Sequence, residues 1–148
     1  MRKVVIGSDH AGYSLKERIK QVLDDEFEFI DVGTDSEEAA DYPIYANLVG
    51  QQVAVSPDAL GVVICGNGVG ICIAANKVNG VRCGLAYSIE TAKQARQHNN
   101  ANVVSVGGRS SMMDDPVDIV RTFLTTDFSG EERHAKRVEE IMDIERNN

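Results

Sequence analysis

The chain is short of basic side chains and has no long apolar run. Its 148 residues include 23 acidic and 15 basic residues, which gives a formal net charge of −8. A protein whose main partner is nucleic acid needs a basic surface to meet the phosphate backbone, so that partner is not expected. No apolar run approaches the roughly 20 residues of a membrane span, so no membrane is expected either. The length indicates one domain, residues 1–148.

Cysteine is also scarce, and no signal peptide is expected from the first residues. The chain has three cysteines (Cys65, Cys72 and Cys83), an odd number without a C-x-x-C pair. That pattern fits neither a disulfide framework nor a zinc site. The apolar stretch at residues 4–6 is too short for a signal peptide. We therefore expect a cytoplasmic protein with reduced thiols and no metal or other cofactor.

Five short apolar runs have the composition of β-strands. They cover residues 3–7, 28–32, 60–65, 81–86 and 103–106, and most are continuous and rich in Val and Ile. Such runs are typical of strands that are covered on both faces. Because helical patterns lie between the runs, we expect βαβ units. The predicted fold is a Rossmann-like three-layer α/β/α domain with a parallel sheet of about five strands and a C-terminal helix.

The helices are predicted from apolar spacing and from residues that favour helix starts. Ser88 suits the start of a helix that runs to His98, and Asp114 or Asp115 with Pro116 suits the start of the next. The last helix is expected from about Glu131. The apolar faces that we expect are Leu15, Ile19, Val22 and Leu23 in the first helix, Ile44, Leu48, Val49 and Val53 in the second, and Val138, Ile141 and Met142 in the last.

Chemically useful residues follow four of the predicted strands. Asp9 and His10 follow the first, Cys65 ends the third and precedes a glycine loop at residues 66–70, and Arg109 follows the fifth. Tyr87 and Ser88 follow the fourth. Ligands of such sheets bind at the carboxyl ends of the strands. We therefore expect an acid, a histidine, a thiol, an arginine and the glycine loop to converge on one edge.

The glycine loop at residues 66–70 has glycines at alternate positions. Its N–H groups, with the helix that follows, suit a phosphate or an enolate oxygen. A tight strand-to-helix turn is a purely structural alternative. Dinucleotide binding is a second alternative, but the G-x-G-x-G spacing and the lack of an acid after the next strand disfavour it.

Cys65 is the candidate base, because exposed N–H groups and a helix start favour the thiolate. A small buried core residue is the alternative interpretation. Cys72 and Cys83 have no such context and are expected in the core. His98, at the end of the predicted fourth helix, is either a proton donor or a residue that interacts with the helix dipole.

The densest basic patch of the chain lies in the last predicted helix. Arg133 and Arg137 are four residues apart, so they lie one above the other and suit a phosphate. Ion pairs with Glu131, Glu132 or the neighbouring glutamates are the alternative. Residues 41–43 read as an ordinary helix start to which the sequence alone gives no function.

These segments together resemble the ribose-5-phosphate isomerase B family, which includes the galactose-6-phosphate isomerase subunits. The resemblance covers nearly the whole chain. The segments that carry it are residues 7–12, 31–33, 41–43, 65–70, 74–77, 96–99 and 107–109, with Arg133, His134 and Arg137. It implies a metal-independent aldose–ketose isomerase of a phosphorylated sugar, with ribose 5-phosphate and ribulose 5-phosphate as the expected pair. It also implies a homodimer or a dimer of dimers whose sites are shared between subunits.

The resemblance assigns roles as well. Cys65 is similar to the family's proton acceptor, which works through a cis-enediolate, and His98 to its ring-opening acid, assisted by Asp9. The matching substrate-binding positions are Asp9, His10, Gly66, Asn67, Gly68, Val69, Gly70, Asn99, Arg109, Arg133 and Arg137.

Asn67 departs from the family pattern, which has Thr or Ser at this position. An amide is larger than a hydroxyl, so the substrate preference remains open between ribose 5-phosphate and allose or galactose 6-phosphate. A phosphosugar-binding module without catalysis is a further alternative. The combination of Cys65, His98 and Asp9 argues against it, because a binding module needs no base.

Overall fold

A parallel sheet of five strands forms the centre of the molecule in the computed structural model, which describes residues 1–148. The strands are β1 (Arg2–Ser8), β2 (Phe27–Asp31), β3 (Leu60–Cys65), β4 (Cys83–Leu85) and β5 (Val103–Gly107). Their order is β2-β1-β3-β5-β4, and every neighbouring pair is parallel. Every residue of β3 and β5 is buried, as the continuous apolar runs predicted.

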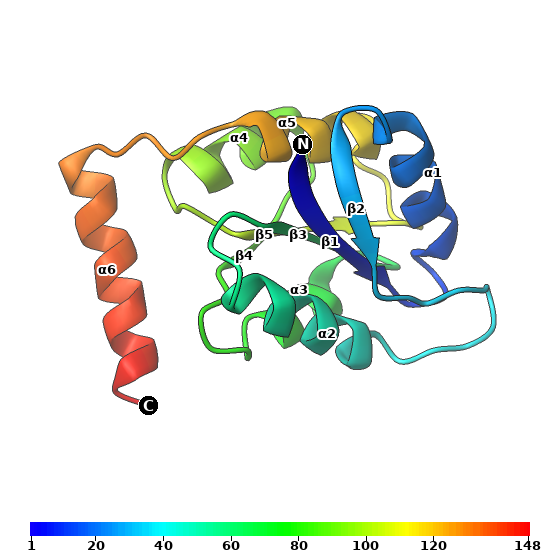
Figure 1. Ribbon diagram of the computed structural model, residues 1–148, viewed down its shortest axis with the longest axis horizontal. Coiled ribbons are helices and arrows are strands. Elements are labelled where there is room, and N and C mark those ends of the chain that lie inside the picture. The colour runs from blue at the N-terminus through cyan, green and yellow to red at the C-terminus, as the bar shows by residue number, and fades with distance from the viewer.

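Helices cover both faces of this sheet (Figure 1). One face carries α1 (Tyr13–Leu23), α4 (Ile89–Gln97) and α5 (Pro116–Thr125), and the other carries α2 (Tyr42–Ala54) and α3 (Val69–Ala75). A cluster of 19 buried apolar residues fills the first interface, and a cluster of 11 fills the second. The predicted α/β/α fold with a five-stranded parallel sheet and a C-terminal helix is confirmed.

Local side-chain chemistry explains where the helices begin. The Ser88 hydroxyl accepts a hydrogen bond from the Thr91 amide, and the Thr91 hydroxyl accepts one from the Ser88 amide, which is a capping box. Asp115 accepts from the Val117 amide at the start of α5, and Pro116 takes the first position of that helix. Both predicted helix starts are thereby confirmed, the second with Asp115 rather than Asp114.

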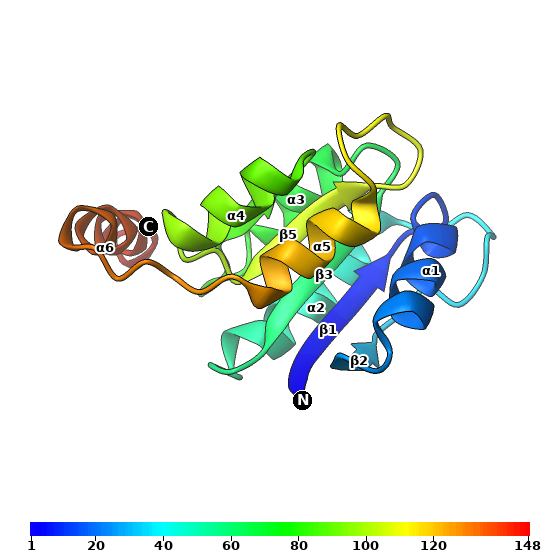
Figure 2. The same cartoon turned by 90° about the horizontal axis from the view of Figure 1, so that it is seen from above.

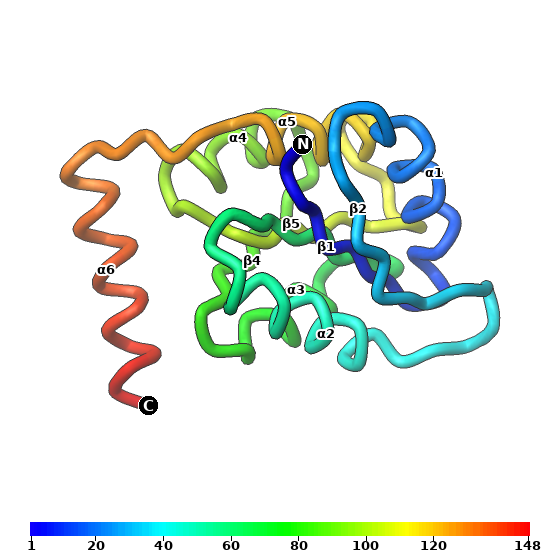
Figure 3. The backbone as a smooth tube through the Cα atoms, viewed as in Figure 1, coloured from blue at the N-terminus to red at the C-terminus, as the bar shows by residue number.

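The last helix, α6 (Glu132–Arg146), stands apart from the layers. An extended segment leads from α5 to α6, which lies beyond the β4 end of the sheet (Figures 1 and 3). His134 is the buried residue of this helix, while Ile141 and Ile144 are exposed. The expectation of a buried face with Val138, Ile141 and Met142 is therefore wrong within one chain, because the five other helices already cover both faces of the sheet. None of the helices combines the length and apolarity that a membrane span requires.

Several smaller expectations were also wrong. Val22, Ile44 and Leu48 are exposed, because the faces of α1 and α2 that meet the sheet are narrower than their apolar patterns. β4 is shorter than predicted, since it pairs with β5 over three residues only. Cys72 and Cys83 are half-buried rather than in the core. Cys83 lies on β4, the outermost strand of the sheet, and Cys72 lies on α3.

Candidate active site

The carboxyl ends of β1, β3 and β5 bring the first group of candidate residues together. Ser8 pairs with Ile64, and Cys65 pairs with Gly107, so the three loops that follow these strands are neighbours. The strands point toward the same edge, as their arrowheads show in Figure 2. The chain places β2 on one side of β1 and β3 on the other, which makes this edge a topological switch point.

A shallow cavity of about 560 Å³ opens at this edge. The residues that line it are Asp9, Ala11, Tyr42, Cys65, Gly66, Asn67, Val69, Gly70, Arg109 and Ser110. His10 and Gly68 belong to the same loops. The sequence reasoning missed Tyr42 as a lining residue. Its position at the start of α2 was the available signal, since a helix that follows a parallel strand begins at the carboxyl edge of the sheet.

Hydrogen bonds hold Asp9 and His10 in place. Asp9 is only 6% exposed, its carboxylate accepts from the Gly12 amide at 3.0 Å, and its own amide donates to the Ile64 carbonyl. The Nδ1 atom of His10 lies 3.1 Å from both the amide nitrogen and the carbonyl oxygen of Ala40. Backbone therefore fixes the orientation of both side chains, and the Nε2 atom of His10 is left for another partner.

Cys65 is the buried thiol of this cavity, with 4% of the residue exposed. Its Sγ lies 3.9 Å from the amide oxygen of Asn67, and the same oxygen accepts a hydrogen bond from the Val69 amide at 2.9 Å. Asn67 thus connects the thiol to the turn that begins α3. The amide nitrogen of Asn67 makes no hydrogen bond within the chain, so it can donate to a bound molecule.

The glycine loop needs glycine where other groups crowd it. Gly68 has a positive φ of 82°, and its carbonyl accepts a hydrogen bond from the Ser105 hydroxyl at 2.6 Å. A Cβ on Gly70 would come within 2.7 Å of the Tyr42 ring. The Gly66 carbonyl accepts from the Arg109 amide at 2.8 Å, which ties this loop to the one after β5. The loop is therefore a rigid part of the cavity wall.

The second group of candidate residues, His98, Asn99, Arg133 and Arg137, lies elsewhere. His98 follows α4, and its ring lies 4.5 Å from that of His134 at the start of α6. His134 is also held by the Ser129 hydroxyl at 2.9 Å. Desolvation, with the nearby charge of Arg133, lowers the pKa of His134, so the ring against His98 is neutral near pH 7.

The basic residues of α6 are exposed around this histidine pair. Arg133 makes an ion pair with Glu131 at 3.2 Å, as one of the alternatives from the sequence proposed, whereas Arg137 has no ion-pair partner. Both side chains are exposed. Arg137 is therefore free to contact an anion that approaches from outside, and Arg133 can exchange its weak, exposed pair with Glu131 for such an anion.

The two groups lie at opposite ends of the strands: the first at the carboxyl edge of the sheet, where the strands end, and the second toward the amino edge, where they begin. The Asn102 carbonyl accepts from the Gly61 amide, so the segment after His98 meets the amino end of β3. Cys65 and Gly107 are paired four residues beyond Gly61 and Val103. At about 3.3 Å per residue, about 13 Å of strand lies between the edges. Within one chain the structure does not bring His98, Asn99, Arg133 and Arg137 to the cavity of Cys65.

The fold and the cavity define a class of protein: an α/β/α domain that offers a buried thiol, a carboxylate and a glycine loop to a small molecule at a topological switch point. No three or more His, Cys, Asp or Glu side chains gather where they could hold a metal ion. Residues 4–141 match the model of the Ribose/Galactose Isomerase family. The chain belongs to this family.

Individual relatives agree with this assignment. The ribose-5-phosphate isomerase B of Mycolicibacterium paratuberculosis is 42% identical over 146 residues, which are 97% of this chain and 92% of the relative. The solved structure of ribose-5-phosphate isomerase B from Clostridium thermocellum is 43% identical, with a TM-score of 0.92 and 98% of each chain covered. That of the Mycoplasma genitalium enzyme, with bound ribulose 5-phosphate, is 40% identical, with a TM-score of 0.92, and covers 99% of this chain and 97% of its own.

Proposed function

We propose that the protein interconverts ribose 5-phosphate and ribulose 5-phosphate. The observation that carries this proposal is the buried Cys65 thiol, which lies in the cavity beside the glycine loop and Asp9. The relatives described above, which cover almost the whole chain, are named for this activity, and one of them was solved with ribulose 5-phosphate. A module that only binds phosphosugars needs no base at this place.

In the proposed reaction, Cys65 as the thiolate removes the proton from C2 of the open-chain aldose. The electron pair of that C–H bond forms the C1–C2 double bond, and the carbonyl electrons move to the C1 oxygen. The product of this step is a cis-enediolate. The C2 hydroxyl then gives up its proton, the C1 oxygen takes one up, and the thiol returns the abstracted proton to C1 as C2 becomes the ketone, so no oxidant or cofactor is consumed. A base that moves a proton in this way contributes about 10²–10⁴-fold to the rate.

The loop at residues 66–70 and Asn67 are suited to the enediolate oxygens. The loop is rigid, and the amide nitrogen of Asn67 is free to donate. Donors that are already aimed at a developing oxyanion contribute about 10²–10³-fold each. Asn67 also lines the cavity, and its amide is larger than a hydroxyl, so it belongs with the determinants of substrate choice.

The remaining roles require a second copy of the chain. We assign ring opening to His98, and phosphate binding to Arg133 and Arg137, with Asn99, supplied by the partner to the cavity of Cys65. Two features support this assignment. The two groups of residues lie at opposite edges of one chain, and exposed apolar residues flank each of them: Val69, Ile73, Leu85 and Tyr87 near the cavity, and Ile141 and Ile144 on α6. A homodimer, alone or within a dimer of dimers, would cover both surfaces.

A substrate panel tests the reaction. Purified protein is assayed with ribose 5-phosphate, allose 6-phosphate and galactose 6-phosphate, and turnover is expected to be fastest with ribose 5-phosphate. A faster reaction with either hexose phosphate would transfer the proposal to that sugar. Absence of turnover with all three would refute the isomerase proposal.

A cysteine variant tests the base. Cys65→Ala is expected to lower kcat at least a hundredfold, while binding of ribulose 5-phosphate, measured by calorimetry, changes little. Cys72→Ala is the matched control, since it removes a thiol outside the cavity. Near-normal kcat in Cys65→Ala would exclude the thiol as the base.

A further inference from the structure

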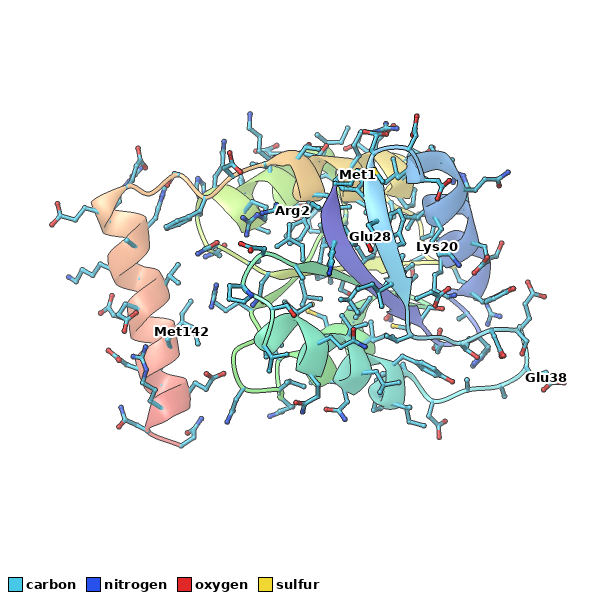
Figure 4. The ribbon with its side chains drawn as sticks, in the orientation of Figure 1. Met1, Arg2, Lys20, Glu28, Glu38 and Met142 are labelled. Carbon is cyan, nitrogen blue, oxygen red and sulfur yellow. The ribbon has the colours of Figure 1, made fainter.

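A second cavity, of about 270 Å³, lies at the amino edge of the sheet, away from Cys65. Three arginines from different parts of the fold line it: Arg2 at the start of β1, Arg82 just before β4, and Arg96 in the last turn of α4. Arg2 is labelled at its strand in Figure 4. The other lining residues are Val53, Ala54, Pro57, Ala59, Leu60, Asn100 and Asn102.

The ion pairs of the whole chain single out these arginines. Four of the nine arginines have a carboxylate within 4 Å, namely Arg18, Arg121, Arg133 and Arg146. Two of the other five are Arg109 and Arg137, which the proposed function already assigns to the substrate. The remaining three all line this one cavity. In a chain with a net charge of −8, three guanidinium groups around one hollow without a paired acid form an exceptional concentration of positive charge.

The hydrogen bonds show which donors are free. Arg96 is only 6% exposed, and its Nε and Nη1 atoms donate to the carbonyls of Thr126 and Ala101 and to the Asn100 side chain. Its Nη2 atom has no partner. Arg2 makes no side-chain hydrogen bond, and neither does the amide nitrogen of Asn100. Each nitrogen of the Arg82 guanidinium already donates, to the carbonyls of Asn99 and Asn100 and to the Met142 sulfur, so Arg82 contributes its charge. The free donors at the cavity are therefore those of Arg2, Arg96 and Asn100.

The nearby carboxylates offset this charge only in part, through the effect of Glu145 on Arg82 and of Asp127 on Arg96. Glu145 accepts a hydrogen bond from the Gly80 amide, and Asp127 is exposed, so neither makes an ion pair with the cluster. Burial lowers the pKa of Arg96, and the charge of Arg2 lowers it further, which outweighs the opposing effect of Asp127. A bound anion would relieve this repulsion.

We propose that this cavity binds a phosphate group, in a site separate from the substrate site. Guanidinium groups suit phosphate because their planar N–H groups match its oxygens. Apolar residues also line the cavity, and charged hydrogen bonds are stronger beside protein than in bulk water. The volume accommodates inorganic phosphate or the terminal phosphate of a larger molecule.

Thermal unfolding with added phosphate tests the site. The substrate site is first weakened by Arg109→Gln and Arg137→Gln in one protein, so that stabilisation by inorganic phosphate reports on the second cavity. At a phosphate concentration ten times Kd, mass action raises Tm by about 3–6 °C. Adding Arg2→Gln to this protein is expected to weaken phosphate binding about tenfold or more. Arg2 is half-buried at the first residue of β1, so this change spares the core.

Lys3→Gln is the matched control, because it removes the same charge one residue away and Lys3 does not line the cavity. Equal phosphate affinity in the Arg2→Gln and Lys3→Gln proteins would overturn the proposal, as would the absence of any phosphate-dependent stabilisation. A parallel titration with ADP identifies the source of the phosphate. Tighter binding of ADP than of phosphate indicates a nucleotide-borne group, and weaker binding indicates the free ion.

Discussion

Two inactive variants should restore activity when they share a dimer, if the active site takes Cys65 from one copy and His98 from the other. The structure gives the reason, since about 13 Å of strand separates the edges that carry these residues within one chain. Cys65→Ala and His98→Gln are each expected to be at least a hundredfold less active than the unmodified protein. In a mixed dimer, one site receives both replacements and the other receives neither.

The recovered activity can be calculated. Equal amounts of the two chains, unfolded and refolded together, form about half mixed dimers, and one of the two sites in each is intact. The mixture is therefore expected to recover about a quarter of the unmodified kcat per site. The assay is turnover of ribose 5-phosphate before and after refolding, with sedimentation to confirm the dimer.

A control mixture separates this effect from general rescue. Cys65→Ala with Asp9→Asn should recover nothing, because Asp9 and Cys65 line the same cavity of one chain and no mixed site is intact. Activity that stays at the level of the separate variants in the Cys65 and His98 mixture, while the mixed dimer forms, would refute the shared site.

Three further predictions concern stability and binding. Gly12→Ala should lower the free energy of unfolding by about 1–3 kcal/mol in thermal or urea unfolding, because the new Cβ meets the Ile64 carbonyl oxygen at 2.6 Å, and an unchanged stability would contradict that contact. Burial by itself raises the pKa of Asp31, but hydrogen bonds from Lys16 and other donors outweigh it and hold the pKa below its usual value. Asp31→Asn should therefore lower the free energy of unfolding by about 1–3 kcal/mol at pH 7. This difference in stability from the unmodified protein should shrink as pH falls below about 4, because Asp31 then becomes protonated. A difference in stability that persists at pH 2 would contradict the ion pair. Arg137→Ala should raise KM for ribose 5-phosphate more than it lowers kcat, and a loss confined to kcat would remove the phosphate-binding role.

The layers of the fold were predictable because strands that are buried on both faces have continuous apolar sequences. The continuous runs that became β3 and β5 could not face water, and Ser88 and Asp115 mark their helix starts through local hydrogen bonds. The C-terminal helix was predicted as an element but not in its packing. Its apolar residues show only that it needs a partner, and they do not distinguish the body of the same chain from a second copy.

The candidate site was likewise predictable in part. The rule that ligands bind at the carboxyl ends of parallel strands located Asp9, Cys65 and Arg109 correctly at one edge. It could not locate His98, which lies one helix length from its strand. The topology nevertheless contained the answer, because a helix that begins at the carboxyl edge with Ser88 must end near the amino edge.

The positions of the charged residues follow from the same geometry. A small α/β domain leaves N–H groups and helix starts at the carboxyl edge, where an anionic intermediate is stabilised without many side-chain charges. The amino edge has no such supply, so any anion that is held there requires arginine. The unpaired arginines outside α6 are distributed accordingly, with Arg109 alone at the cavity of Cys65 and Arg2, Arg82 and Arg96 around the cavity at the opposite edge. The charges of Arg2 and Arg82 disfavour the charged form of Arg96, and a bound anion would offset that repulsion, which is why the cavity at the amino edge merits the phosphate titration first.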